Sequence, residues 1–153
     1  MKHRKLFVRT GILVLLMLPT IALAHYLAFP QETSCIALPF STFSRHGAIY
    51  CSRDVSPKIV ETLTKDVAMA TAQNKILWGD LKAKPIFIFC NTENEFKKYG
   101  DSYGSPATTN TKWGAYIVIS KDGLDPNIIA HEMCHAELYA QLGFSNYHFG
   151  IPT

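Results

Sequence analysis

The stretch DPNIIAHEMCHAELYAQLG, residues 125–143, predicts a long helix that carries a pair of histidines. Asp125 can cap its N-terminus, Pro126 suits the first helical position, and the final glycine ends it. Positions i and i+4 of a helix differ by about 40° around the axis and about 6 Å along it. His131 and His135 therefore project from one face, with room for a metal ion between their rings.

The residue types in this HEMCH segment are those of a catalytic zinc centre. Zinc takes imidazole nitrogen at about 2.0–2.1 Å, and a catalytic site keeps one position for water. Glu132 lies next round the helix and is the expected general base for that water. Burying these three side chains without partners would be costly, and a metal ion removes that cost. We therefore predict a Zn²⁺ site with His131 and His135 as ligands. The alternative is a chance pattern on a packing helix.

The rest of the chain predicts a small α+β domain, with a short sheet packed on two main helices. The first main helix follows Ser56 and ends at Gly79, with apolar residues at helical spacing. KPIFIFC (84–90) and GAYIVIS (114–120) have the apolar, β-branched composition of buried strands. A brief helix capped by Thr92 lies between them. Residues 101–114 are rich in Gly, Ser, Thr, Asn and Pro, which predicts a loop.

The N-terminal segment explains the basic charge of the chain. Hydrophobic residues make up 48% of the chain, charged residues make up 18%, and the net charge is +3. Four of the basic residues precede the apolar run at 11–29, and without them the net charge is about −1. The charge therefore gives no support for nucleic-acid binding. We interpret residues 1–29 as either a cleavable signal peptide or an anchor, with inner-membrane association through residues 6–29. Both place the remainder outside the cytoplasm, in the periplasm or the extracellular space.

Export makes disulfides a reasonable expectation for the four cysteines. Cys35 and Cys51 bracket a turn-rich segment within residues 30–56, and a bond between them would stabilise this weak piece by about 3 kcal/mol. Cys90 ends a strand and Cys134 lies in the HEMCH helix. These two form either a second bridge or two buried apolar positions.

The span from residue 84 to residue 153 resembles the small gluzincin-type (thermolysin-like) zinc metallopeptidases. The strands KPIFIFC and GAYIVIS, the helix IIAHEMCHAELYAQLG and the ending FGIPT carry the resemblance. It implies a zincin-like fold for residues 57–153 and peptide-bond hydrolysis with zinc as the cofactor. It also implies that residues 115–120 form the sheet edge that pairs with an extended substrate. The alternative for 115–120 is an ordinary sheet strand.

The third zinc ligand is the open point of this resemblance. In such families a segment like Ile-Pro-Thr runs on to a Glu-Gly pair on a second helix, and that glutamate is the ligand. The sequence ends at Thr153, so we expect a metallopeptidase domain interrupted before this residue. His148 is the candidate substitute, against an interpretation as a surface or packing histidine. Glu137 lies about 200° round the helix from His135, which excludes it as a ligand of the same ion.

Two functions follow from the sequence. The first is an exported or membrane-tethered zinc-dependent peptidase-like protein, inactive in this form unless its site is completed. Its partner is a peptide or protein substrate. The second is a non-catalytic, disulfide-stapled envelope domain that binds a partner. A third zinc ligand is the feature that distinguishes them.

Overall fold

A five-stranded mixed sheet forms the centre of the computed structural model, which describes residues 17–100 and 106–149, with side chains in the last helix as far as residue 143. The strand order is β1-β2-β3-β5-β4. The three inner strands run parallel, and β1 and β4 lie antiparallel at the two edges. Their bounds are β1 (Ser44–His46), β2 (Ile49–Cys51), β3 (Ile86–Phe89), β4 (Ala107–Thr111) and β5 (Gly114–Ile119). The predicted α+β class is confirmed.

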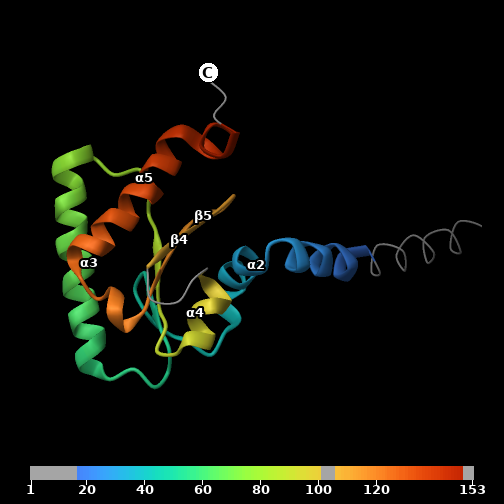
Figure 1. Cartoon of the computed structure of the whole chain (residues 1–153), viewed down its shortest axis with the longest axis horizontal. Helices are drawn as coiled ribbons and strands as arrows, with labels where there is room; N and C mark the ends of the chain where they lie inside the picture. The colour runs from blue at the N-terminus through green and yellow to red at the C-terminus, as the bar shows by residue number, and fades with distance from the viewer. Residues whose placement is uncertain (1–16, 101–105, 150–153) are drawn as a thin grey trace, which may run out of the picture.

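Helices cover both faces of this sheet (Figure 1). The long helices α3 (Pro57–Trp78) and α5 (Pro126–Phe149) lie side by side on one face. The short helices α2 (Pro30–Ile36) and α4 (Glu93–Tyr99) cover the other face. Two short 3-10 turns, η1 (Leu38–Phe40) and η2 (Lys121–Gly123), lie in the connections after α2 and β5. The sequence predicted main helices on one face only. The second layer forms because the inner strands are apolar on both sides.

The inner strands supply two hydrophobic cores by simple alternation of their side chains. Phe87, Phe89, Ile117 and Ile119 pack with Leu63 of α3 and with Ile129 and Met133 of α5. The intervening residues Ile88 and Val118 pack on the opposite face with Phe96 and Tyr99 of α4. The first core fixes α5 against the sheet, and this contact positions the HEMCH segment.

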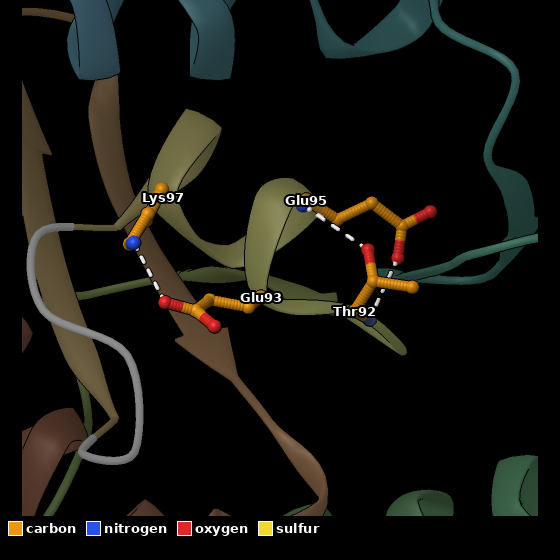
Figure 2. A network of polar contacts seen from close by, with 4 residues as sticks. All are labelled: Thr92, Glu93, Glu95 and Lys97. Atoms are coloured by element: carbon orange, nitrogen blue, oxygen red, sulfur yellow. Dashed lines mark hydrogen bonds and ion pairs between the residues drawn. The ribbon is translucent and has the colours of Figure 1, made fainter.

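The predicted ends of α3 and α4 and the predicted start of α5 are confirmed, although the Ser56 side chain makes no capping hydrogen bond. The predicted end of α5 at Gly143 is a kink, after which the helix continues to Phe149. Gly79 ends α3 with φ 73° and Gly143 interrupts α5 with φ 76°, a conformation that glycine adopts without strain. Figure 2 shows the start of α4, where the Thr92 hydroxyl accepts a hydrogen bond from Glu95 N at 3.2 Å and the Glu95 carboxylate accepts one from Thr92 N at 3.1 Å. This reciprocal capping box satisfies two N–H groups that the helix leaves free.

The loop predicted at residues 101–114 is wrong for part of its length. Ala107–Thr111 form β4, which pairs antiparallel with β5 across the turn at Lys112 and Trp113. The polar composition suggested a loop, but three of these five residues are threonine, which suits the pleated backbone of a strand. An edge strand tolerates polar residues because only one of its sides is paired.

The predicted disulfide between Cys35 and Cys51 is also wrong, since all four cysteines are free thiols. Cys35 lies in the core beneath α2 and α4, and its thiol donates to the carbonyl oxygen of Tyr99. Cys51 lies on β2 and points into the other core, on the opposite face of the sheet. Segment 30–56 is held without a disulfide, because its strand β2 pairs directly with β3.

Thiol labelling is expected to distinguish the buried cysteines from Cys134. Burial, with a smaller contribution from the charge of Glu32, raises the pKa of Cys35 to about 12, and burial raises the pKa of Cys51 to about 11. At pH 8 only about one Cys35 thiol in ten thousand is ionised, and the thiolate is the reactive form. We expect the native chain to label quickly at Cys134 alone, which is partly exposed. In denaturant all four thiols should label, whereas a chain with one native disulfide would label at only two cysteines.

Residues 17–28 form a helix that extends away from the sheet (Figure 1). Its apolar side chains include Leu18, Ile21 and Leu27, all more than half exposed. No helix in the described residues is long and apolar enough to cross a membrane. Residues 1–16 lie outside the described part of the chain, so the signal or anchor at residues 1–29 stays a prediction.

Candidate functional site

The two histidines of the HEMCH segment lie side by side on the outer surface of α5. Their Nε2 atoms are 3.2 Å apart, and their rings lie 4.8 Å apart between centroids with an interplanar angle of 88°. His131 is exposed and His135 is partly exposed, so the burial that we expected for the two histidines is wrong. The two rings lie on one face of the helix as predicted, with one nitrogen of each ring close to the other.

This separation fits a zinc ion held by both rings. Two nitrogens that each lie 2.0–2.1 Å from a tetrahedral zinc ion are about 3.3–3.4 Å apart. The observed 3.2 Å is within about 0.2 Å of that value. A hydrogen bond from the N–H of one imidazole to the bare nitrogen of the other also suits this distance. The hydrogen bond directs one ring N–H at the other nitrogen, whereas zinc needs the lone pairs of both nitrogens directed at the ion, so zinc binding requires a rotation of the rings.

Glu132 turns inward from the histidines and is held by the edge strand of the sheet. Its side chain is buried, and its Oε2 accepts a hydrogen bond of 2.5 Å from the hydroxyl of Thr108 on β4. The same hydroxyl lies 3.1 Å from the carbonyl oxygen of Glu132. Thr108 thus fixes the Glu132 carboxylate against β4, on the buried side of α5. The sequence analysis missed Thr108, because a threonine in a polar segment has no spacing that connects it to the helix.

The described part of the chain contains no group of three His, Cys, Asp or Glu side chains able to hold a metal ion. Cys134 turns toward α3, where its thiol donates to the Asn74 side chain at 3.2 Å. His46 lies on β1, at the opposite edge of the sheet from β4. The predicted third ligand His148 belongs to α5 by its backbone, but its side chain lies outside the described residues. The described residues therefore offer two candidate ligands, His131 and His135.

Glu137 has a structural role, in agreement with its exclusion as a ligand. Its side chain is 1% exposed, and its oxygens accept hydrogen bonds from Lys82 N, Ala83 N and the Gln141 amide at 3.1, 2.8 and 2.6 Å. Burial alone would raise the pKa of Glu137. The two backbone donors, Gln141 and the charge of Lys82 outweigh burial and lower it. Glu137 thereby ties the segment that precedes β3 to α5.

Glu137→Gln is expected to lower the free energy of unfolding by about 2 kcal/mol at pH 7, because the amide turns an NH₂ group toward buried N–H donors. A lowered pKa means that the stabilisation is present above the ordinary carboxyl pKa and is lost as the pH falls through the folded-state pKa. The difference from wild type should therefore shrink below about pH 4. Urea unfolding at both pH values measures it, with the exposed Glu61→Gln as the control. Equal losses in the two variants would contradict this role.

The edge of the sheet beside the HEMCH segment is β4, and not residues 115–120 as the resemblance implied. β5 is paired on both sides, with β3 and with β4, so it has no open edge for a substrate. Residues 115–120 are an inner strand. Besides Thr108, the buried Tyr139 ties β4 to α5, since its hydroxyl donates to the carbonyl oxygen of Thr111 at 3.0 Å. Tyr139 is thus a packing aromatic whose hydroxyl connects α5 to β4.

In comparisons with protein-family models, with curated proteins and with solved structures, no match to this chain was found. The function therefore has to be argued from the residues of the site.

Proposed function

We propose that this chain is an exported or membrane-tethered zinc-dependent peptidase-like protein of the gluzincin type. The observation that carries the proposal is the 3.2 Å separation of the His131 and His135 Nε2 atoms beside a buried carboxylate. The four-residue spacing of the histidines, the position of Glu132 and the adjacent sheet edge are what a zincin-like fold requires. The α+β architecture is compatible with such a fold.

The residues of the site have separate tasks in this proposal. His131 and His135 would hold the zinc ion through their Nε2 atoms. Zinc, when bound, would polarise the scissile carbonyl group and lower the pKa of a water molecule. Glu132 would serve as the general base that accepts a proton from the attacking water and passes it to the leaving amine. Thr108 keeps the Glu132 carboxylate in place by its 2.5 Å hydrogen bond.

The edge strand β4 is the proposed binding surface for the substrate backbone. A peptide in extended conformation can add to the open edge of a sheet through main-chain hydrogen bonds. β4 lies at the end of the strand order among the described residues, and Thr108 connects it to Glu132. A peptide bound there would pass close to the histidine pair.

The ligand count favours one further candidate, a non-catalytic envelope domain that binds a partner. The described residues supply two protein ligands, whereas a catalytic zinc site has three. The disulfide that we expected in such a domain does not form between Cys35 and Cys51. This candidate therefore rests on the ligand count alone.

The proposed location is the periplasmic or extracellular side of the cytoplasmic membrane. The exposed apolar side chains on helix 17–28 suit either insertion into a bilayer or recognition by a signal peptidase. The helix projects away from the folded body (Figure 1), so that a membrane at this end would leave the sheet and α5 accessible.

Zinc binding and peptide hydrolysis by the full chain in a non-ionic detergent test the proposal. We expect one zinc ion to bind per chain in calorimetric titration. Hydrolysis of a denatured protein substrate, followed by mass spectrometry, should stop with a chelator and return with zinc. Zinc binding without hydrolysis would favour the non-catalytic candidate. A chain that binds no zinc would refute the peptidase proposal.

A further inference from the structure

A cavity of about 350 Å³ lies beside the proposed site, and three lysines line it. Lys82 and Lys84 come from the segment that precedes β3, and Lys112 comes from the turn between β4 and β5. Trp113 forms part of the wall and is 72% exposed. The remaining lining residues are small or apolar positions of β5 and α5, namely Ala115, Ala136, Tyr139 and Ala140, with Ala83 and Gly114.

The charge of this cavity is positive, because its described lining contains three lysines and no acidic side chain. The acid closest in the fold is Glu137, whose two oxygens already accept hydrogen bonds from Lys82 N, Ala83 N and Gln141. Glu137 offsets part of the charge of Lys82. In the part of the chain that the structure describes, none of the three lysines takes part in an ion pair. The cavity therefore offers exposed ammonium groups to an anion.

The position of the cavity connects it to the edge strand. Thr108 and Asn110 pair with Ile117 and Ala115, so their side chains lie on the sheet face that packs against α5. Thr108 contacts Glu132, and Lys112 lies four residues further along the chain, in the turn after β4, at most about 13 Å away. Ala136 and Tyr139 place the cavity on the turns of α5 that follow His135. The cavity thus adjoins the end of β4, and Glu132 contacts the same strand at Thr108.

We propose that this cavity binds the carboxylate of an acidic side chain in a peptide that lies along β4. This inference rests on the proposed function, and it names the substrate class as acidic peptides. Alternate residues of an added strand direct their side chains to the same face of the sheet. The residues opposite Thr108 and Asn110 therefore face α5, and Lys112 follows in the turn at the end of β4. An acidic residue about four positions from the bond beside Glu132 lies at this end of β4, within reach of the lysines.

Binding by the full chain in detergent, without zinc, tests this site independently of hydrolysis. The probes are blocked, otherwise uncharged extended peptides with one glutamate placed four positions before or after the central bond, and the matching glutamine peptides. Because Trp113 lies in the cavity wall, its fluorescence reports binding. The other tryptophan is Trp78, and a Trp113→Phe variant separates the two fluorescence signals. We expect one glutamate peptide to bind about fivefold more tightly than its glutamine counterpart, less at high salt.

The lysine variants identify where the preference arises. Lys112→Gln should reduce the preference for glutamate, and the triple variant Lys82→Gln, Lys84→Gln, Lys112→Gln should remove it. Lys58→Gln is the matched control, since it removes one exposed lysine about 30 Å away at the other end of α3. Acid-selective binding without hydrolysis would retain this site and refute the peptidase activity. Hydrolysis of both peptides without selectivity would refute this site alone. If free acetate displaces the fluorescent signal as well as the glutamate peptide does, the cavity is a simple anion site and the proposed peptide binding is refuted.

Discussion

Glu132→Gln is expected to bind zinc like the wild type and to hydrolyse peptides at least about 100-fold more slowly. The amide has nearly the shape of the carboxylate and can still accept a hydrogen bond from Thr108. It cannot take a proton from water, so the chemical step loses its base. Steady-state hydrolysis of one peptide, with zinc content measured on the same preparation, separates these two effects.

Thr108 supplies a second test of how Glu132 is held. Thr108→Val keeps the shape of the side chain but removes the hydroxyl that donates to Glu132. We expect about tenfold slower hydrolysis and unchanged zinc affinity. Thr108→Ser keeps the hydroxyl and should remain close to wild type. A Glu132→Gln variant that hydrolyses peptides normally would show that another group acts as the base.

The helices could be predicted from the sequence because their determinants are local. Thr92 with Glu95 and Asp125 with Asn127 form capping hydrogen bonds within one turn of a helix, and Pro57 lies in the first turn of α3. The histidine pair was predictable for the same reason, since four residues along a helix fix the relative direction of two side chains.

The edge strand and its contacts could not be predicted in this way. Ala107–Thr111 contain no apolar alternation, because this strand lies at the edge of the sheet and pairs on one side. Its assignment as a strand depends on pairing with β5, and its link to the site depends on the contact between Thr108 and Glu132, 24 residues apart. The lysine cavity likewise joins two segments about 30 residues apart in sequence.

The cysteine prediction failed because spacing says nothing about the face of a sheet. Cys35 and Cys51 are close in the chain, but they lie in different cores on opposite faces of the sheet. The sheet lies between the two thiols, so their separation by only sixteen residues in the chain does not bring them into contact. Burial against apolar side chains is the role that remains for both.

The histidine pair should lose zinc when either member is removed. His131→Ala and His135→Ala each leave one described ligand, and we expect at least about 100-fold weaker zinc binding, since a change in a supporting residue alone costs about 10–100-fold. Both residues lie on the exposed side of α5, so the free energy of unfolding of the metal-free chain should change by less than about 1 kcal/mol. Calorimetric zinc titration and urea unfolding measure the two quantities.

Variants of other potential ligands make this test specific. Cys134→Ala removes a thiol that contacts Asn74 on α3, and His46→Ala removes a histidine at the opposite edge of the sheet, so neither should change zinc affinity. Loss of zinc in His148→Ala would identify His148 as the third ligand, since that substitution leaves the pair intact. Unchanged zinc affinity in His131→Ala would mean that the 3.2 Å approach of the two rings reflects a hydrogen bond between them and not a metal site. The peptidase proposal would then lose its metal, and with it the group proposed to polarise the scissile carbonyl.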